Sequence, residues 1–236
     1  MGPAAEGRGV VGFGSRVGGV SEGPYDSLNI GVLTDDADAA VVENRRRLAA
    51  AVGVDPRDVP IGLQVHKADL AVHAGRQDPS PFTEPGTVLE EVDGHVVRGP
   101  GLAPLVLTAD CLPVALAGPG GVAMLHCGWR GLAAGIVARG AEVVEATSAA
   151  IGPGIGPCCY EVGPEVLETF ADLGDGIATD RMLDLPEIAR RLLARAGVEQ
   201  VESAGLCTSC NPELFFSHRR DKGVTGRMGS LAWIEG

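Results

Sequence analysis

The chain has 236 residues, 45% of them hydrophobic, which is enough for one sizeable core, and we predict a single domain over residues 1–236. Thirty-one acidic against nineteen basic residues give a formal net charge of −12, which repels phosphate backbones and anionic lipid headgroups. We therefore expect neither nucleic acids nor membrane surfaces as partners. The N-terminus MGPAAEGRGVVGFGSR lacks the apolar core of a signal peptide, and no apolar run reaches the roughly 18 residues of a membrane span. A cytoplasmic protein is expected.

The first half of the chain predicts one helix followed by short strands. The helix runs from about Asp38 to Val52, with N-cap oxygens from Asp35 and Asp36 and an end at Gly53. Apolar, β-prone runs bounded by Gly, Pro or Asp then predict five strands, at residues 61–65, 94–97, 105–108, 114–117 and 122–125.

Two more helices and a last strand are expected in the second half. The run LAAGIVARGAEVVEA after Gly131 has helical spacing despite its glycines. A third helix is predicted from about Pro186 to Ala196, with proline in the first turn and Gly197 after its end. The final MGSLAWI reads as a strand with Trp233 facing the core.

Three residues of metal-binding types occur where predicted strands give way to loops: His66 in LQVHKAD, Cys111 in TADCLPV and His126 in LHCGWRG. Such positions combine a fixed backbone with an accessible side chain. Two imidazoles and one thiolate suit a catalytic zinc, since they leave a fourth tetrahedral position for water, whose pKa the metal lowers to about 7. The three ligands are 45 and 15 residues apart and match no short zinc signature.

Two other readings of these residues remain open from the sequence. In one, each histidine is a hydrogen-bonded residue at a strand end and Cys111 is a small core side chain. In the other, Cys111 is a nucleophile with one histidine as its base, as in amidases and deamidases. His73 and His95 lack any such context and are expected on the surface or in loops, while His218 is undecided.

The remaining cysteines are expected to be free thiols in a reducing compartment. Cys207-Thr208-Ser209-Cys210 is a lone CxxC, with no second CxxC or CxxH to complete a structural zinc site, so a surface loop or an occasional redox pair is favoured. The adjacent Cys158 and Cys159 are poorly placed to bridge each other. GPGIGP, residues 152–157, is read as a rigid turn, because its prolines remove amides that a phosphate loop would use.

Arginines gather in a few places of this acidic chain, at residues 45–47, 130, 219–220 and 227. Bidentate guanidinium contacts could form a local anion pocket from some of them. A solvated helix face or surface ion pairs is the plainer reading for Arg46, Arg47 and Arg220. Arg130 stands out because it follows Trp129 close to His126.

In these motifs the sequence resembles the YfiH family, also described as a laccase-domain, multicopper polyphenol oxidase-like or purine nucleoside phosphorylase family. The resemblance spans nearly the whole chain, through GSRVGGVSEGPYDSLNIG, ENRRRL, QVHKAD, TADCLPV, LHCGWRGLAAG, GPGIGPCCYEVG, CTSCNPELFFSHRRD and TGRMGSLAWI. It implies that His66, Cys111 and His126 are zinc ligands. It also implies an α+β fold, a multilayer (α/β/β/α-type) sandwich with mixed sheets like those of the CNF toxin and YfiH.

The function implied by the resemblance is a zinc-dependent purine nucleoside phosphorylase acting on adenosine, inosine, guanosine and methylthioadenosine, with adenosine deaminase activity. Its partners would be these nucleosides and phosphate. Two alternatives are a Cys–His amide hydrolase or editing factor acting on peptidoglycan precursors, and a copper-dependent polyphenol oxidase (laccase). A purely structural zinc in a binding protein is a third reading. The oligomeric state is not predicted.

Further roles are expected around the metal. His66, Cys111 and His126 are predicted to be catalytic, with Asp93 as the carboxylate that moves protons during deamination. Arg45 and Arg130 are expected to hold phosphate, and Asn29 to contact ribose or base.

The sequence departs from the family pattern at three places that border the expected site. Lys67 stands where glycine is usual after QVH, Cys127 replaces the alanine of HAGWRG, and EVDGHVV replaces an ADA-containing stretch while keeping Asp93. Metal choice or substrate range could change through these positions, while all three ligands stay in place.

Overall fold

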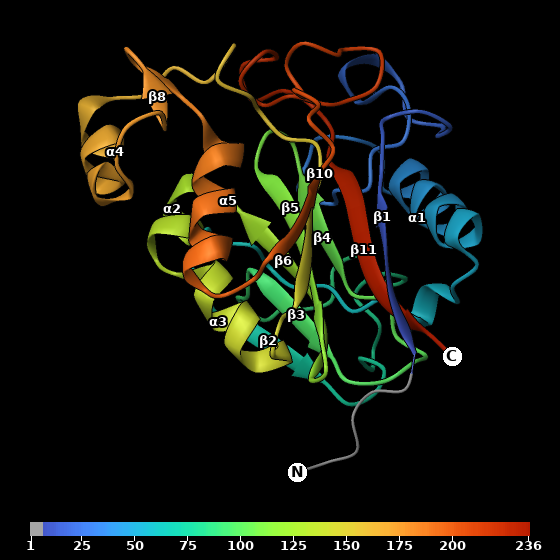
Figure 1. Ribbon diagram of the computed structural model, residues 1–236. Helices are drawn as coiled ribbons and strands as arrows, with labels where there is room; N and C mark the ends of the chain where they lie inside the picture. Colours follow the sequence, from blue (N-terminus) through green and yellow to red (C-terminus); the bar gives the residue numbers. More distant parts are fainter. Residues whose placement is uncertain (1–6) are drawn as a thin grey trace.

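The computed structural model describes residues 7–236, so the first six residues, on which part of the expectation about targeting rests, lie outside the described range. Figure 1 shows helices on two sides of the strands, as expected for a mixed α and β fold. The described strands are β1 (Arg8–Phe13), β2 (Leu70–His73), β3 (Gly94–Val97), β4 (Leu105–Thr108), β5 (Leu112–Gly118), β6 (Gly121–Cys127), β7 (Ser148–Ile151), β8 (Ala178–Thr179), β9 (Met182–Leu183), β10 (Gln200–Ser203) and β11 (Met228–Glu235). The α-helices are α1 (Asp38–Val52), α2 (Trp129–Ala133), α3 (Ile136–Val144), α4 (Pro164–Thr169) and α5 (Leu185–Arg195). Short 3-10 turns cover Gly23–Tyr25, Pro56–Asp58 and Ala171–Leu173.

The larger sheet is mixed and has the strand order β10-β7-β5-β6-β3-β2. Its central hairpin, β5 and β6, pairs antiparallel from Leu112 with Cys127 to Gly118 with Gly121, while β2 with β3 and β7 with β10 are parallel. Side chains alternate between the two faces of a strand. On one face they pack with helices α2, α3 and α5 in a core that includes Val114, Leu116, Ala123, Leu125, Leu132, Ile136, Val137, Ile188 and Leu193.

The smaller sheet joins the two ends of the chain, in the order β1-β11-β4, all antiparallel. Its side chains pack against the other face of the larger sheet in a second core of Val97, Val106, Ala115, Val122, Met124, Ala232 and Ile234. Helix α1 covers the outer side in a third core with Ile30, Leu48, Ala49, Phe82, Leu105 and Leu231. Trp233 is partly buried against this third core, as expected for the last strand.

The bounds predicted for α1 are confirmed, but its capping is different. Gly53 ends the helix in the left-handed conformation, φ 73°, which glycine adopts without steric cost. The N-cap is Ala37, and no side chain caps the helix. Asp36 instead accepts hydrogen bonds from the Ser21 hydroxyl (2.6 Å) and the Asn29 amide (2.9 Å), and so ties the preceding loop together.

Two predicted elements are wrong in part. Residues 61–65 do not form a strand, because the Gln77 side chain takes up both the N–H and the C=O of Ile61, and only Leu63 makes an isolated bridge, with Glu91. The long helix expected after Gly131 is divided into α2 and α3, since Gly135 has φ 85°, which interrupts a right-handed helix.

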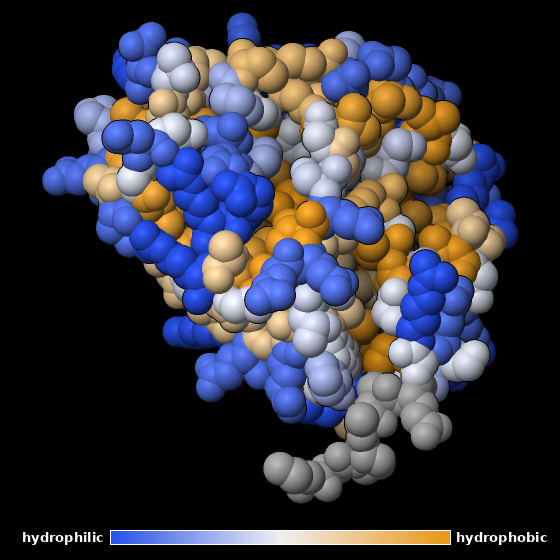
Figure 2. Space-filling view, in the orientation of Figure 1, coloured by the Kyte–Doolittle hydropathy of each residue, from blue (hydrophilic) through white to orange (hydrophobic). Residues whose placement is uncertain are grey.

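The surface is mixed in character. On the face seen in Figure 2, hydrophilic side chains break the hydrophobic surface into separate patches. Across residues 7–236, none of the helices combines the length and the apolar composition needed to cross a membrane.

Asn44 on α1 holds the loop that leads into the helix. It is fully buried; its Nδ2 donates to the Ser21 hydroxyl and to the carbonyls of Ser27 and Asn29, and its Oδ1 accepts from the Val20 N–H. We predict that Asn44→Ala lowers the free energy of unfolding by about 2–4 kcal/mol, because several buried polar groups lose their partner. Urea denaturation followed by circular dichroism measures this change in the free energy of unfolding.

Arg46→Ala is the matched control on the same helix. The Arg46 side chain is 62% exposed and pairs with Glu43, so its loss should change the unfolding free energy by less than about 1 kcal/mol. Equal effects of the two substitutions would contradict the role assigned to Asn44.

Candidate metal centre

The structure brings His66, Cys111 and His126 together from three separate segments. His66 lies in the loop before β2, Cys111 between β4 and β5, and His126 in β6. Their potential ligand atoms all lie within 4.8 Å of one another, and the two imidazole rings meet edge to face with centroids 4.8 Å apart. Burial increases from exposed His66 through half-buried Cys111 to buried His126, so the cluster is open on one side.

Asp93, directly before β3, organises two of these residues. Its carboxylate accepts hydrogen bonds from the backbone N–H groups of Val65 (3.1 Å), His66 (2.9 Å) and Lys67 (2.8 Å), and lies 2.8 Å from Nδ1 of His126. An imidazole that donates from Nδ1 presents a lone pair at Nε2, so this contact prepares His126 to bind a metal through Nε2.

A part for Asp93 in moving protons during deamination stays a prediction, and the structure shows a positioning role. The residue is fully buried, and it is absent from the lining of the cavity described below. Both carboxylate oxygens are already engaged by backbone and imidazole donors, and these contacts hold the pKa of Asp93 below its usual value despite its burial. Asp93 is therefore a positioning residue for the His66 loop and the His126 ring.

Cys111 and His126 face each other, and each shifts the pKa of the other. Burial opposes ionisation of the Cys111 thiol, but the facing His126 and hydrogen bonds from both histidines lower its pKa below the ordinary value. Burial likewise opposes protonation of His126, yet the Cys111 thiolate and Asp93 raise its pKa. A thiolate at neutral pH is the form of cysteine that binds metals or acts as a nucleophile.

The backbone around the cluster is unusual. His66 has φ 61° and Asp110, just before Cys111, has φ 91°, a left-handed region that non-glycine residues seldom adopt. The Asp110 carboxylate accepts hydrogen bonds from the Thr208 hydroxyl (2.6 Å) and from the Arg219 backbone N–H (2.7 Å), which hold this residue in place. Strained residues of this kind concentrate at functional sites.

Gly128 is required by the close approach of the ligands. A Cβ atom at this position would lie 2.9 Å from the Cys111 sulfur and 3.1 Å from the Cδ2 of His66. Glycine therefore lets the HCGWRG turn pass directly beneath two of the three residues.

The donor set fits a divalent metal ion. Zinc is bound in proteins by imidazole nitrogens at about 2.0–2.1 Å and thiolate sulfur at about 2.3 Å, and catalytic sites use three protein ligands and keep one position open. The three side chains meet these requirements in type, number and proximity, and Asp93 supplies the usual outer partner of a ligating histidine. They form a candidate metal site; the donors alone do not distinguish zinc from copper.

The cluster lies in the wall of a cavity of about 460 Å³, within the range of roughly 300–1,000 Å³ that small-molecule sites occupy. One part of the lining is apolar and comes from the loops before α1, β2 and β3 and from β4. The apolar residues there are Val32, Leu33, Ile61, Leu63, Leu89 and Leu107.

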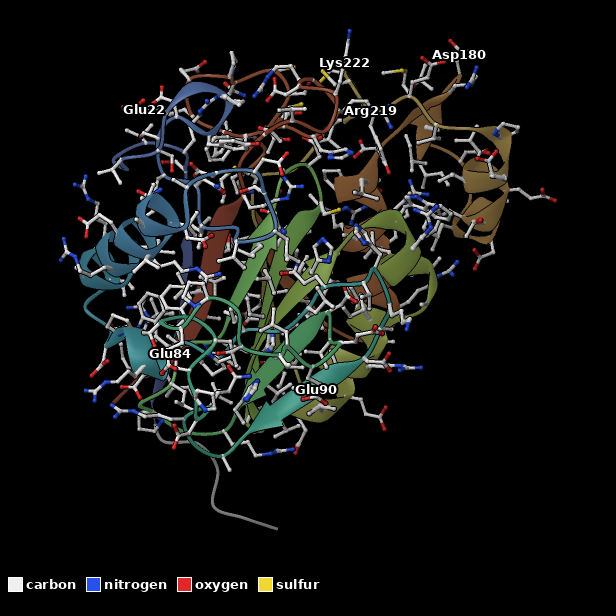
Figure 3. The ribbon with its side chains drawn as sticks, turned by 180° about the vertical axis from the view of Figure 1, so that it is seen from behind. Glu22, Glu84, Glu90, Asp180, Arg219 and Lys222 are labelled. Carbon is white, nitrogen blue, oxygen red and sulfur yellow. The ribbon has the colours of Figure 1, made fainter. Side chains whose placement is uncertain are left out.

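Four arginines line the same cavity in a protein whose net charge is −12: Arg45, Arg130, Arg219 and Arg227. The Arg130 guanidinium lies 4.4 Å above the Trp129 ring, and among residues 7–236 no hydrogen bond or ion pair engages it. Arg219, at the upper loops in Figure 3, stacks on Tyr160 at 5.1 Å and donates to the Glu161 carbonyl.

Arg45 is held more firmly than the sequence indicated. It is 2% exposed and donates from Nε to the Ile30 carbonyl and from Nη1 to the carbonyls of Pro81 and Phe82. Burial lowers the pKa of Arg45 to about 10, so it stays charged at neutral pH. These hydrogen bonds join α1 to two loops. A role for Arg45 in phosphate binding stays a prediction.

Asn29, for which a contact with ribose or base stays a prediction, has a structural role. It is fully buried, it is absent from the cavity lining, and its amide is used within the protein. Nδ2 donates to Thr34 and Asp36, while Oδ1 accepts from the N–H groups of Gly31 and Arg227. Asn29 instead fixes the backbone of Arg227, a cavity residue that the sequence placed only among its arginine clusters.

The other histidines and the family departures have distinct places. His95 is fully buried in β3, 3.0 Å from the ring of His73, so expecting it on the surface or in a loop is wrong. His218 lines the cavity. Lys67 pairs with Glu91 at the surface, and Cys127 packs into the core beneath the helices, so neither side chain lines the cavity.

Comparison with known proteins gives one consistent result. Residues 10–235 match the family described as "Multi-copper polyphenol oxidoreductase laccase". The chain is 40% identical to the Escherichia coli protein named purine nucleoside phosphorylase YfiH, over 93% of this chain and 91% of that protein. The crystal structure of YlmD from Geobacillus stearothermophilus superposes with a TM-score of 0.90 at 33% identity, covering 97% of this chain and 92% of the other.

A second crystal structure, of the Bacillus licheniformis hypothetical protein YfiH, gives a TM-score of 0.89 at 34% identity, with 96% of this chain and 93% of that one covered. Likeness at this identity and over this length goes beyond a shared architecture, and the resemblance stated from the motifs is confirmed. The chain belongs to the YfiH family of laccase-domain proteins.

Proposed function

We propose that this protein is a metal-dependent purine nucleoside phosphorylase, with zinc as the metal. One observation carries the proposal: the His66–Cys111–His126 cluster and four arginine guanidiniums line a single cavity of nucleoside dimensions. Relatives at 35–40% identity carry the name purine nucleoside phosphorylase, which supports nucleosides and phosphate as substrates.

The arginines that line the cavity would bind the phosphate. In phosphorolysis phosphate attacks C1′ as the bond to the purine breaks, and the phosphate must be held close to C1′ and shielded from water. Arg130 is the main candidate, because its guanidinium has no partner among the described residues and is oriented by Trp129. Arg219 and Arg227 extend the positive surface, and Arg45 contributes charge from a fixed, buried position.

The apolar part of the lining suits the purine ring. Leu63, Leu89 and Leu107 offer a surface against which a flat base can pack, and burying it removes apolar area from water. Guanidinium groups for the phosphate and apolar side chains for the base, in one cavity, would together orient the nucleoside.

His66, Cys111 and His126 would hold the metal. When bound, zinc supplies Lewis-acid chemistry beside the substrate. The protein's own contribution is preorganisation: Asp93 fixes the His126 tautomer and the His66 backbone, and Gly128 keeps the floor of the cavity open. We assign no general acid or base, since both carboxylate oxygens of Asp93 already accept hydrogen bonds.

Adenosine deamination finds less support. Asp110 is the one carboxylate in the described lining, and its two oxygens already accept from Thr208 and Arg219. The Cys–His amide hydrolase is favoured by one specific feature, the contact of Cys111 with His126, which lowers the pKa of the Cys111 thiol. Copper-dependent oxidation rests on the family description alone.

The remaining structural expectations stay part of the proposal. We infer that residues 1–236 form one domain and that the three cores correspond to an α/β/β/α-type order of layers. The high coverage of the solved relatives supports both.

The first test uses metal-quantified protein incubated with adenosine, with and without phosphate, and chromatography of the products. Phosphate-dependent adenine and ribose 1-phosphate are expected, and Cys111→Ala should abolish them because the metal loses its thiolate. Cys127→Ala, which changes a core cysteine outside the cavity lining, is the matched control and should keep the activity. A fully metallated protein without turnover would contradict the proposal, and a covalent acyl adduct on Cys111 would favour the hydrolase. Inosine would reveal deamination.

Arg130→Ala tests the phosphate site. The loss of a charge-assisted contact should raise the KM for phosphate about 10- to 100-fold while changing the KM for adenosine much less. Arg98→Ala, a surface arginine outside the cavity, should leave both constants unchanged. Equal effects on phosphate and adenosine would remove Arg130 from this role.

Asp93→Asn separates positioning from proton transfer. We expect the affinity for zinc to fall about 10- to 100-fold, as for other outer partners of ligating histidines, with most of the activity restored at saturating zinc. Equilibrium zinc titration with a chromophoric chelator and rate measurements over zinc concentration check this. Asp69→Asn, an exposed carboxylate nearby, is the control. A fully metallated Asp93→Asn protein that remains inactive would contradict a purely positioning role and would favour a role for Asp93 in proton transfer.

A further inference from the structure

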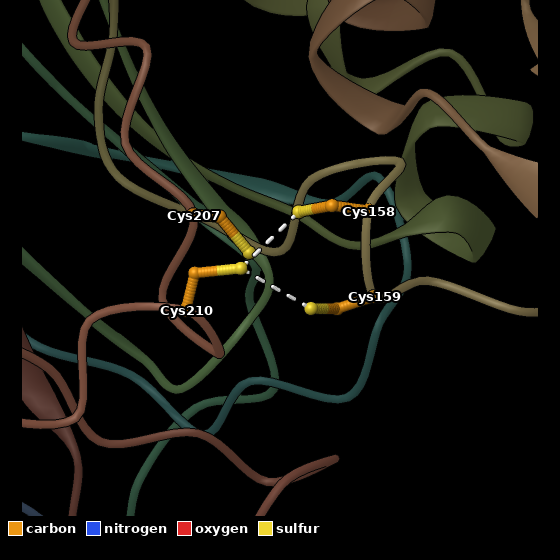
Figure 4. Close-up of side chains that lie close together, drawn as sticks. All are labelled: Cys158, Cys159, Cys207 and Cys210. Carbon is orange, nitrogen blue, oxygen red and sulfur yellow. Dashed lines mark hydrogen bonds between the residues drawn. The ribbon is translucent and has the colours of Figure 1, made fainter.

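Four cysteines outside the candidate metal centre meet at the surface. Cys158 and Cys159 lie in the loop after β7, and Cys207 and Cys210 in the loop after β10. Their sulfur atoms all lie within 4.8 Å of one another. Figure 4 shows the side chains pointing toward a common centre from opposite loops, with the Cys210 sulfur 3.4 Å from those of Cys158 and Cys159.

This arrangement changes the interpretation of the lone CxxC. The sequence offers no second CxxC, but the fold supplies the missing pair from an adjacent Cys-Cys. The two loops lie side by side because Gly154 bonds to both neighbours of Cys207: its N–H donates to the Leu206 carbonyl (3.3 Å) and its carbonyl accepts from the Thr208 N–H (3.0 Å). Residues 152–157 thus hold the two loops together so that Cys158 and Cys159 face Cys207 and Cys210.

Core packing does not explain the cluster. Cysteine in a protein interior behaves as a small hydrophobic residue, but Cys158 and Cys210 are exposed and Cys159 and Cys207 only half buried. Four surface thiols gathered within contact distance form instead a set of sulfur donors of the kind that binds soft or borderline metal ions.

The hydrogen bonding around one sulfur is that of a metal ligand. The backbone N–H of Gly156 donates to Cys207 Sγ at 3.3 Å, an outer contact that orients a thiolate. A Cβ at Gly156 would lie 3.4 Å from the Cys207 Cβ and 3.5 Å from the Cys158 sulfur, so this turn passes close to the cluster.

We propose that Cys158, Cys159, Cys207 and Cys210 bind a second zinc ion, in a closed structural site separate from the cavity. Zinc–sulfur bonds of about 2.3 Å place the sulfurs of a tetrahedral site about 3.8 Å apart. The observed separations, 3.4 Å for two pairs and within 4.8 Å for all, lie on both sides of this value. Four protein ligands leave no open position, so the site is structural.

The second site would brace the wall of the cavity. Tyr160, directly after Cys159, lines the cavity and carries Arg219 on its ring. Thr208, between Cys207 and Cys210, donates to Asp110 beside the ligand Cys111. Joining the two loops therefore fixes a cavity side chain and the turn that presents Cys111, and the inference does not depend on the reaction carried out there.

The test is the zinc content of the full-length protein, purified with reductant and dialysed against limiting free zinc. We expect two zinc ions per chain in the wild type and one in Cys207→Ser/Cys210→Ser. His66→Ala/Cys111→Ala should also retain one, and X-ray absorption of that variant should report zinc with sulfur neighbours only, at about 2.3 Å. Cys127→Ala, which lies outside both clusters, should keep two.

Single exposed substitutions, Cys158→Ser and Cys210→Ser, keep the test valid if the double variant does not fold. Each should bind the second zinc at least 10-fold more weakly and lower the Tm, with the first zinc retained. The proposal is overturned if the wild type holds one zinc that His66→Ala/Cys111→Ala loses entirely. It is also overturned if intact mass under native conditions finds these four cysteines oxidised to disulfides, or if all four react with a thiol reagent in excess zinc.

Discussion

The carboxylate of Asp93 is the interaction on which the candidate site depends. It is buried directly before β3, and it accepts from three consecutive backbone N–H groups, those of residues 65–67, and from the His126 ring. A buried carboxylate without such donors would be costly, so the loop that carries His66 must adopt the conformation that supplies them. The Asp93 carboxylate therefore fixes His66, on a loop, relative to His126, on a strand. The same hydrogen bonds hold the backbone of His66 in its left-handed conformation.

The second constraint is electrostatic. A strongly acidic chain gathers four arginines around one cavity and holds them by different means: backbone carbonyls for Arg45, aromatic rings for Arg130 and Arg219, and neighbouring carbonyls for Arg227. Side chains fixed in this way lose little freedom when an anion arrives, which favours binding of phosphate. Apolar side chains line the rest of the cavity, so guanidinium groups and apolar surface are both available to the substrate of the proposed reaction.

Local signals predicted the elements well where a single residue decides the backbone. Gly53 ends α1 where expected, and the apolar runs of β3 to β6 lie within the observed strands. Prediction failed where a distant side chain intervenes, as when Gln77 replaces a strand neighbour of Ile61. The three candidate metal ligands, which the structure brings together, followed from residue type, position and motif resemblance. The burial of Asn29 and Asp93 did not, because hydrogen bonds across the fold set it. The same holds for the four cysteines, whose meeting depends on the contact between Gly154 and the segment around Cys207.

The central claim is that His66, Cys111 and His126 bind a metal at the wall of a substrate cavity. Anomalous diffraction at the zinc edge, from crystals of the protein purified with zinc and soaked with a nucleoside, tests it most directly. We predict an anomalous peak at a zinc ion bound by His66, Cys111 and the Nε2 of His126, with the nucleoside beside it in the arginine-lined cavity. Density for the nucleoside elsewhere, or zinc-loaded crystals without a peak at these three side chains, would contradict it.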